Sequence, residues 1–279
     1  MRSNPYQSKT ALISGAGSGI GYELAVQFAD HGANIIATDI RKERVEKVVE
    51  IIREKKVKVH GYAVDHSDFT QVEEFGRQVL AENGKVDILC CNAGIGHSGT
   101  IGNIEMKDWK WVVNINFWGQ IYLINKFVPL MMERNQGWVL ITASGAGLFP
   151  LAGMSAYCCT KTAMVFLANT MHMELRKHNI NVSALCPGVI NTNIIRDGKM
   201  QGAANQAFAI KMYEKIGTHP SKVARAGIRG LRRNKAIIRT PLYHIALNHF
   251  LYRLWPLQLL RLGALLYKRG WNFLGPVLK

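Results

Sequence analysis

The sequence lacks a long apolar segment. Its 279 residues contain no run of about eighteen uncharged apolar residues, the length needed to cross a bilayer, so no membrane-spanning helix is predicted. Residues 1–9 are polar and lack the apolar stretch of a secretory signal peptide. The pattern therefore gives no indication of a spanning helix or of a secretion signal.

Cysteine is scarce and is not arranged for disulfides or for zinc. Two adjacent pairs and one single residue account for all five cysteines: Cys90, Cys91, Cys158, Cys159 and Cys186. A disulfide framework or a zinc site needs other spacings, and no C-x-x-C occurs. We therefore expect free thiols, buried or partly buried, and no bound metal. Free thiols favour a reducing compartment, which predicts a cytoplasmic protein.

Acidic residues are missing from the last part of the chain. The whole sequence has 35 Lys and Arg against 19 Asp and Glu, a formal net charge of +16. Residues 219–279 hold twelve of the basic residues and no Asp or Glu, which leaves +4 for residues 1–218. A basic block of this kind favours an anionic surface: nucleic acid, a membrane or an acidic protein.

Short β-branched segments alternate with longer helical patterns. Strands are predicted at residues 10–14, 34–39, 57–63, 86–91, 138–143, 180–186 and 236–239, and the helices between them include 19–31, 41–55 and 220–233. No repeat or low-complexity linker interrupts this order. The alternation predicts an α/β fold with a doubly wound parallel sheet of about seven strands, in a single domain over residues 1–241. Residues 242–279 form a hydrophobic and basic C-terminal extension.

A glycine-rich turn follows the first predicted strand and opens the first helix. Residues 15–21 read GAGSGIG. Glycines at such a turn let the backbone approach a pyrophosphate, which lies at the positive end of the helix dipole. A glycine-rich turn by itself can be an ordinary loop, but here a strand precedes it, a helix follows it, and Asp39 ends the second strand. The combination predicts a dinucleotide site.

Asp39 indicates which dinucleotide is bound. A carboxylate at this place accepts hydrogen bonds from the adenosine ribose hydroxyls and repels a 2′-phosphate. Ser18, inside the turn, is uncharged and gives no support to NADP. Arg41 favours NADP instead, because a guanidinium near the ribose can accommodate a phosphate. The sequence predicts NAD, with NADP as the alternative.

Further short motifs follow in the chain. They are CNAG at 91–94, NFWG at 116–119, YCCTK at 157–161 and PGVINT at 187–192, and Ser144 lies thirteen residues before Tyr157. Residues four apart share one face of a helix, so Tyr157 and Lys161 can reach one bound group. Alone, such a pair is as readily a packed tyrosine beside a solvated lysine. In this order and at this spacing the motifs resemble those of the classical short-chain dehydrogenase/reductase family, over residues 9–239.

The chain departs from the family's pattern at two positions. Ser14 stands where the family usually has threonine before the glycine turn, which keeps the hydroxyl. Cys91 replaces the first asparagine of the family's Asn-Asn-Ala-Gly. The resemblance implies a Rossmann-type fold and hydride transfer between NAD(H) and an alcohol or carbonyl compound. A sensor or scaffold that binds NAD without catalysis is the alternative.

The resemblance also implies roles for four catalytic residues. Tyr157 exchanges the proton of the substrate hydroxyl, and Ser144 helps to hold the oxygen on which charge develops. Lys161 anchors the nicotinamide ribose and lowers the pKa of Tyr157. Asn116 kinks a long helix and holds a water for a proton relay. Ordinary structural roles are the alternative for two of them. Ser144 can be a loop hydroxyl, and Asn116 can be an amide hydrogen-bonded to the backbone.

Cofactor contacts are implied for the residues of these motifs, with Thr192 bonding the carboxamide. The implied set is Ser14, Gly15, Gly17, Ser18, Gly19, Ile20, Gly21, Asp39, Arg41, Asp65, Asn92, Ala93, Gly94, Tyr157, Lys161, Pro187, Gly188, Val189, Ile190 and Thr192.

Apolar residues gather in the two segments that the family places over its substrate. They are Leu148, Phe149, Leu151, Met154, Ile194, Ile195, Met200, Phe208, Ile210 and Met212. They favour a small hydrophobic alcohol or ketone, such as a steroid, a retinoid or a long-chain lipid, and packing of a loop (193–217) on the core is the alternative. The family commonly forms dimers or tetramers, so a homodimer or homotetramer is expected.

The C-terminal extension combines apolar and basic residues. Two apolar segments flank Pro256, with Arg253, Arg261, Lys268 and Arg269 among leucines and aromatics. This composition favours a pair of helices lying in a membrane surface. Contact with a partner subunit is the alternative. Nucleic acid is disfavoured, since the basic residues are interleaved with bulky aliphatics. The expected location is cytoplasmic, with peripheral attachment to a membrane.

Overall fold

The computed structural model of the protein describes residues 4–200, 203–269, 271–272 and 275–276. Seven parallel strands form its central sheet, in the order β3-β2-β1-β4-β6-β7-β9. They are β1 (Thr10–Ser14), β2 (Asn34–Asp39), β3 (Val59–Ala63), β4 (Ile88–Cys91), β6 (Gly137–Thr142), β7 (Ile180–Pro187) and β9 (Ile237–Thr240). The predicted α/β fold with a seven-stranded parallel sheet is confirmed. The third and fourth strands each begin two residues later than predicted.

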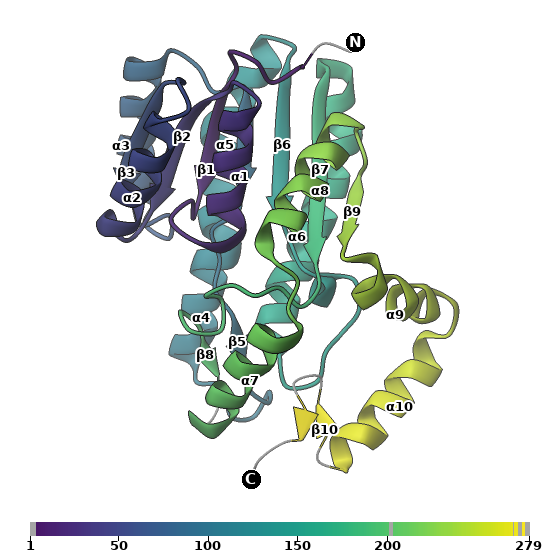
Figure 1. Ribbon diagram of the computed structural model, residues 1–279. Coiled ribbons are helices and arrows are strands. Elements are labelled where there is room, and N and C mark those ends of the chain that lie inside the picture. The colour runs from purple at the N-terminus through teal and green to yellow at the C-terminus, as the bar shows by residue number, and fades with distance from the viewer. Residues whose placement is uncertain (1–3, 201–202, 270, 273–274, 277–279) are drawn as a thin grey trace.

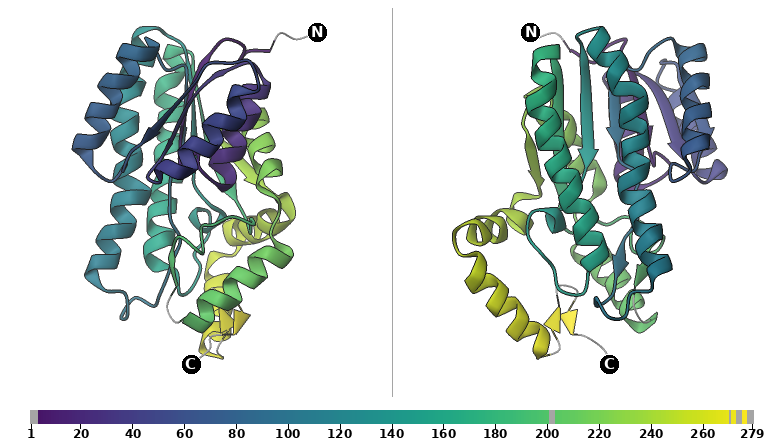
Figure 2. Two further views of the ribbon diagram at one scale, coloured as in Figure 1. Left: turned by 60° about the vertical axis from the view of Figure 1, so that its left-hand side comes forward. Right: turned by 180° about the vertical axis from the view of Figure 1, so that it is seen from behind.

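Helices cover both faces of the sheet (Figures 1 and 2). One layer consists of α1 (Gly19–Asp30), α2 (Lys42–Arg53) and α8 (Pro220–Arg232), and the other contains α3 (Phe69–Asn83), α5 (Gly119–Glu133) and α6 (Ser155–Glu174). Alternate residues of β1 pack into opposite layers, Leu12 on the α3–α5–α6 side and Ile13 on the α1–α2–α8 side. Burial on both faces explains why β1 is apolar or small along its whole length.

The carboxyl ends of the strands all point to one edge of the sheet, at the bottom of Figure 1. The chain turns in opposite directions after β1 and β4, so this edge carries the crevice in which doubly wound sheets bind their ligands. The remaining short elements gather here. They are β5 (His97–Ser98), α4 (Met106–Val113), β8 (Lys199–Met200) and α7 (Ala203–Ile216).

The segment predicted as a loop over residues 193–217 is largely structured. Its strand β8 pairs in parallel with β5, and α7 follows. The pairing ties this segment to the loop after β4, which is distant in sequence. Ile195, Met200 and Ala209 form a small apolar cluster of their own, which supplies the tertiary packing that a short helix needs.

Helices α9 (Leu242–Leu254) and α10 (Pro256–Lys268) leave the sheet after β9 and form a projecting arm (Figure 1). A two-stranded β10 (Trp271–Asn272) and β11 (Gly275–Pro276) follows. In α10 no residue is buried. Among the described residues, no helix has the length and apolar character to cross a bilayer.

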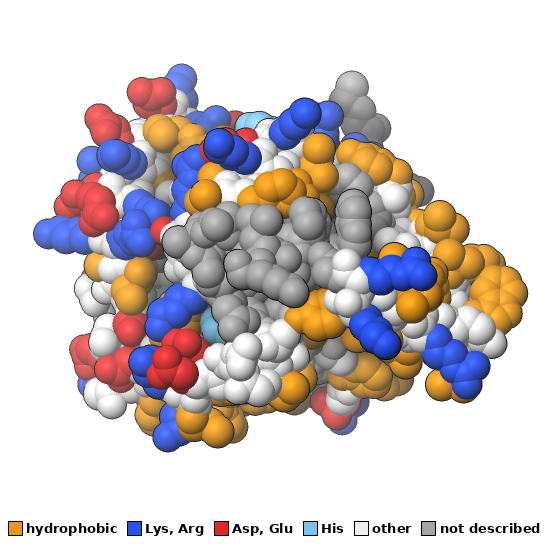
Figure 3. Space-filling view, turned by 90° about the horizontal axis from the view of Figure 1, so that it is seen from below, with side chains coloured by type: hydrophobic (Ala, Val, Ile, Leu, Met, Phe, Trp, Pro, Cys, Tyr) orange, Lys and Arg blue, Asp and Glu red, His pale blue; other side chains and the backbone are white. Residues whose placement is uncertain are grey.

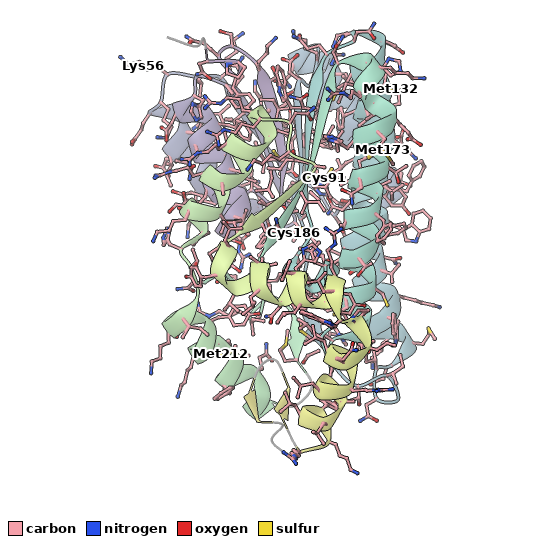
Figure 4. The ribbon with its side chains drawn as sticks, turned by 90° about the vertical axis from the view of Figure 1, so that its right-hand side faces the viewer. Lys56, Cys91, Met132, Met173, Cys186 and Met212 are labelled. Carbon is pink, nitrogen blue, oxygen red and sulfur yellow. The ribbon has the colours of Figure 1, made fainter. Side chains whose placement is uncertain are left out.

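All five cysteines are free thiols, and four of them are buried. Cys91 and Cys186, labelled in Figure 4, lie within the sheet near the carboxyl ends of β4 and β7. Only Cys159 is exposed. The predicted free, mostly buried thiols are confirmed.

Candidate active site

A cavity of about 360 Å³ opens at the carboxyl edge of the sheet. Residues of the glycine turn and the end of β2 line one end, and residues after β6 and β7 line the other. The lining includes every residue of the implied cofactor set except Ser14, Gly17 and Gly21. It also includes every implied catalytic residue except Asn116. The tertiary structure therefore brings together motifs that are up to about 180 residues apart in the chain, as parallel α/β topology requires.

The glycine turn has the backbone geometry expected for a phosphate cradle. Gly15 and Gly19 adopt φ of +64° and +56°, in the left-handed region that a side chain disfavours. A Cβ on Gly15 would lie 3.0 Å from Ala93 Cα, and one on Gly19 would lie 3.0 Å from Thr192 Cγ2. Helix α1 begins at Gly19, so its first amides face the cavity.

Ser14 and Gly21 act behind the cavity wall. The Ser14 hydroxyl is fully buried, accepts from the amides of Asn92 at 2.8 Å and Ala93 at 2.9 Å, and donates to the Cys90 carbonyl at 3.3 Å. The hydroxyl therefore fastens the loop after β4 to the end of β1, and serine suffices for this where the family has threonine. A Cβ on Gly21 would lie 2.1 Å from the Gly15 carbonyl oxygen, so only glycine fits there.

The end of β2 carries a compact charged cluster. The buried Asp39 accepts from the amide of Gly17 at 3.2 Å and from the amide of Arg41 at 3.1 Å. A Cβ on Gly17 would lie 2.5 Å from Arg44 Cβ and 2.8 Å from Asp39 Oδ2. Gly17 therefore makes room for the arginine and the carboxylate instead of facing the cavity. Arg41 and Arg44 both bind Asp197 from the segment after β7.

Tyr157 and Lys161 lie one turn apart on α6, both buried. Lys161 Nζ is 5.7 Å from the centroid of the Tyr157 ring and donates to the Thr142 carbonyl at 3.1 Å. Ser144, at the end of β6, forms a hydrogen bond with Tyr157 and also accepts from the Ala146 amide at 3.1 Å. The serine, the phenol and the ammonium thus converge on one end of the cavity.

Burial governs the titration of this pair. It raises the pKa of Tyr157 above the ordinary 10.0, and the hydrogen bond from Ser144 offsets only part of that increase. Burial also lowers the pKa of Lys161 to about 8. The lowering of the Tyr157 pKa expected from Lys161 is not seen in the protein alone, where desolvation of the phenolate is the largest influence.

Asn116 lies in η1 (Asn114–Trp118), a π-helical turn between α4 and α5. This interruption is the kink that the resemblance implies, and π-helical turns are frequent at functional sites. The amide is fully buried, accepts from the Ile95 amide at 2.8 Å and donates to the Ile95 carbonyl at 3.0 Å. A Cβ on Gly94 would lie 3.1 Å from Asn116 Oδ1 and 3.2 Å from Lys161 Nζ. Asn116 and Lys161 thus flank Gly94 from behind.

Half of the apolar residues named from the sequence line the cavity: Phe149, Leu151, Met154, Ile194 and Ile195. The others pack elsewhere or lie at the surface. Met200, Ile210 and Met212 belong to or contact the small cluster under α7, where Figure 4 places Met212. Leu148 packs on the main core, and Phe208 is 42% exposed. The set therefore divides between residues that line the cavity and residues that pack elsewhere or lie at the surface.

Several residues that line the cavity were not predicted from the sequence. Trp111 and Tyr213 come from α4 and α7, and Ile245 comes from α9 in the C-terminal extension. Ile245 is 1% exposed, and a Cβ on Gly145 would lie 3.3 Å from its Cγ1. No motif marks these positions, because only the packing of α7 and α9 under the sheet brings them to the cavity. Asp197 and Arg44 were missed for the same reason.

A nicotinamide dinucleotide fits the residues present. The glycine cradle and the Asp39 carboxylate line one end of the cavity, and Tyr157 and Lys161 line the other. A nucleotide can approach the backbone closely because Gly15, Gly19 and Gly94 carry no side chain where neighbouring residues leave little room. In the described part of the chain, no group of three His, Cys, Asp or Glu side chains is arranged to hold a metal ion.

Comparison with known proteins agrees with this geometry. The protein named "Probable oxidoreductase EphD" of Mycobacterium tuberculosis is 32% identical over 240 residues, which are 81% of this chain. The chain spans only 40% of the length of EphD. The 3-oxoacyl-[acyl-carrier-protein] reductase FabG of Thermotoga maritima is 32% identical over 186 residues, 67% of this chain and 76% of that protein.

Solved structures are similar over nearly the whole chain. A short chain dehydrogenase/reductase of Burkholderia phymatum in complex with NAD superposes with a TM-score of 0.81 and 27% identity, covering 91% of this chain and 95% of that one. A 3-ketoacyl-(acyl-carrier-protein) reductase of Brucella melitensis complexed with NADH gives a TM-score of 0.73 and 27% identity over 84% and 97% of the two chains. The family profile for short chain dehydrogenases matches residues 9–201. The chain is thus a member of the short chain dehydrogenase family of oxidoreductases.

Proposed function

We propose that the protein transfers a hydride between NAD(H) and a hydrophobic alcohol or carbonyl compound. The observation that carries the proposal is the convergence of Ser144, Tyr157 and Lys161 at one end of a cavity whose other end holds the glycine cradle and Asp39. A non-catalytic NAD-binding sensor would need the cradle but not Ser144 beside the buried Tyr157. A screen of alcohols and ketones with NAD and NADP in both directions, followed by absorbance, tests the proposal.

The chain's own residues account for the proton chemistry. Ser144 and the Tyr157 hydroxyl would both hold the substrate oxygen, so that charge developing on it is met by two hydrogen bonds. In reduction Tyr157 donates its proton to that oxygen, and in oxidation it takes the proton back. Lys161 and Asn116 lie behind Gly94, where they would position the nicotinamide ribose and relay the proton. When bound, the nicotinamide ring supplies the carbon that accepts or releases hydride.

The direction of the reaction should depend on pH through Tyr157. Burial keeps its phenol protonated at neutral pH, which is the form that reduction needs, whereas oxidation needs the phenolate. We therefore expect kcat/KM for oxidation to rise between about pH 6 and pH 9, while that for reduction stays nearly constant, because the phenol remains mostly protonated over the whole range. Parallel profiles in both directions, measured with one alcohol–ketone pair, decide this. An oxidation rate that does not change over the range contradicts the assignment of Tyr157 as the base.

Asp39 should set the preference for NAD. Asp39→Ala removes the carboxylate proposed to bind the ribose hydroxyls and to repel a 2′-phosphate, so NAD binding should weaken by about tenfold and its advantage over NADP should narrow. The ratio of kcat/KM for the two cofactors measures both effects. Because Asp39 also holds the amides of Gly17 and Arg41, Asp39→Asn is the matched control for shape without charge. Wild-type preference for NADP would overturn the assignment and make Arg41 a phosphate ligand.

The apolar wall supports the substrate class. The cavity is lined by Phe149, Leu151 and Met154 from one segment, by Ile194 and Ile195 from another, and by Ile245 from the extension. A wall of this kind favours a substrate with an extended hydrocarbon part over a sugar. Comparing kcat/KM along a series of secondary alcohols of increasing chain length tests it, with the rate expected to rise with length. A preference for polyols would contradict it.

A peripheral membrane surface is proposed for the arm formed by α9 and α10. Neither helix contains Asp or Glu. Large apolar residues of the arm stay exposed: Leu242, Tyr243, Leu247, Phe250, Leu254, Trp255, Leu257, Leu260, Leu262, Leu265 and Leu266. Seen from below, hydrophobic and basic side chains cover the arm, while acidic side chains gather on the opposite side of the molecule (Figure 3). Such a surface suits insertion into anionic lipid.

A homodimer or homotetramer is proposed as well. Phe166 and Met173, on the outer face of α6, are 69% and 71% exposed. Met173 points outward from the helix in Figure 4. Trp118 is 43% exposed and stacks on Tyr122 of α5. Apolar side chains on neighbouring helices are what an isologous contact buries. Sedimentation velocity gives the oligomeric state directly.

A further inference from the structure

Asp197 reaches across the mouth of the cavity to the opposite wall. It belongs to the segment between β7 and β8, where its amide donates to the Asn193 carbonyl at 2.7 Å. Its carboxylate binds Arg44 through both oxygens, Nη1 to Oδ2 at 2.7 Å and Nη2 to Oδ1 at 3.1 Å. Oδ1 also accepts from Arg41 Nη2 at 3.0 Å. One carboxylate thus engages two guanidinium groups from the β2–α2 connection.

These arginines lie beside the carboxylate proposed to bind the ribose. Arg41 is two residues after Asp39, and its amide donates to Asp39 Oδ1. The stem of Arg44 lies over Gly17, whose amide donates to Asp39 Oδ2. Arg44 and Asp197 are only 20% and 26% exposed in their side chains. Partial burial makes the ion pair less screened by solvent than a surface pair and holds both groups at the β2 end of the cavity.

A 2′-phosphorylated nucleotide would need these guanidinium groups. Arginine binds phosphate through a planar fork of N–H donors, and the fork of Arg44 is already occupied by a carboxylate. A phosphate arriving there would have to displace Asp197 or lie next to its charge as well as that of Asp39. A nucleotide with a free 2′-hydroxyl meets neither obstacle.

We propose that Asp197 is a specificity-determining residue that excludes 2′-phosphorylated dinucleotides by occupying Arg41 and Arg44. The inference rests on the proposed NAD function and adds a second determinant to Asp39, located on the segment that covers the cavity. The arginines near the ribose then stabilise the closed segment instead of binding phosphate. Without Asp197, the same two guanidinium groups would favour the 2′-phosphate.

Calorimetric titration with ADP and 2′,5′-ADP tests the inference without any turnover. Asp197→Asn should strengthen 2′,5′-ADP binding by about tenfold or more and change ADP binding by less than about threefold. The ratio of the two dissociation constants is the readout, because a merely structural role of Asp197 would weaken both nucleotides alike. Asp197→Glu, which keeps the charge, should stay near the wild-type ratio.

Glu214→Gln is the matched control. Glu214 of α7 pairs with Arg196, the residue before Asp197, and does not line the cavity. This variant therefore loses the same charge with no effect on Arg41 or Arg44. Its ratio should equal that of the wild type. Adding Arg41→Leu and Arg44→Leu to Asp197→Asn should abolish the gain, because the two arginines are its source. If Asp197→Asn does not reach the wild-type melting temperature, Asp197→Ser serves in its place.

Suppose that the wild type binds ADP normally and that Asp197→Asn leaves the affinities for both nucleotides unchanged or weakens them equally. This result would overturn the inference and leave the proposed function standing. A wild type that binds 2′,5′-ADP more tightly than ADP would overturn it too. If the wild type bound neither nucleotide, the proposed function would fail first and the inference with it.

Discussion

Replacing Tyr157 by Phe should lower kcat/KM by about a thousandfold in both directions, the scale of a principal acid/base group. The ring still fills its buried place on α6, but it has no proton to exchange and no hydroxyl to share with Ser144. NADH affinity should stay within about threefold, since Lys161 and the glycine cradle are untouched. Fluorescence titration with NADH and steady-state rates on the same preparation separate the two effects.

Tyr213→Phe is the informative comparison for this variant. Tyr213 comes from α7, lines the same cavity, and is buried enough that its pKa rises to about 12. It lies near Tyr157 without being part of the Ser144 hydrogen bond. We expect its removal to affect KM more than kcat. Tyr157 is not the base if Tyr157→Phe keeps more than about a tenth of the wild-type activity. The same holds if Tyr213→Phe loses more activity than Tyr157→Phe.

The full-length protein should sediment with anionic lipid vesicles and be released completely by detergent but incompletely by salt. Basic side chains near an anionic surface contribute about 1 kcal/mol each, which salt screens, whereas burial of the leucines of α10 is insensitive to salt. A chain ending before Leu242 should stay in the supernatant with its cofactor site intact. Liposome co-sedimentation of both forms tests this.

The structure suggests a sharper variant than the truncation. Ile245 of α9 lies against Gly145 and lines the cavity, so removing residues 242–279 also opens the substrate end. Substituting Gln for Leu257, Leu260 and Leu265 of α10, which are 65%, 45% and 46% exposed, should abolish sedimentation while sparing the cavity.

Phe166→Gln with Met173→Gln, on the exposed face of α6, is the matched control and should sediment as before. If the full-length protein stayed in the supernatant and the α10 variant instead dissociated an oligomer, the arm would be a subunit contact.

The sequence by itself predicted much of what depends on local chain geometry. Strands 10–14 and 34–39 were placed to the residue, because buried parallel strands are short, β-branched and apolar throughout. The glycine turn and the four-residue spacing of Tyr157 and Lys161 are equally local. Known topology then predicts that all strand ends meet at one edge, which is why most of the implied residues line one cavity.

Only the tertiary structure decided which side chains meet across that edge. Arg41, predicted as a ligand of the nucleotide, lines the cavity, and its guanidinium binds Asp197, 156 residues away, in a segment that no motif marks. Ser14, Gly17 and Gly21, also predicted as contacts, are not among the residues that line the cavity. The pKa of Tyr157 depends on how completely its neighbours exclude water. Ile245 reaches the cavity from the C-terminal extension, which was predicted only to follow the domain of residues 1–241. These outcomes depend on packing between distant segments, and sequence spacing carries no information about that.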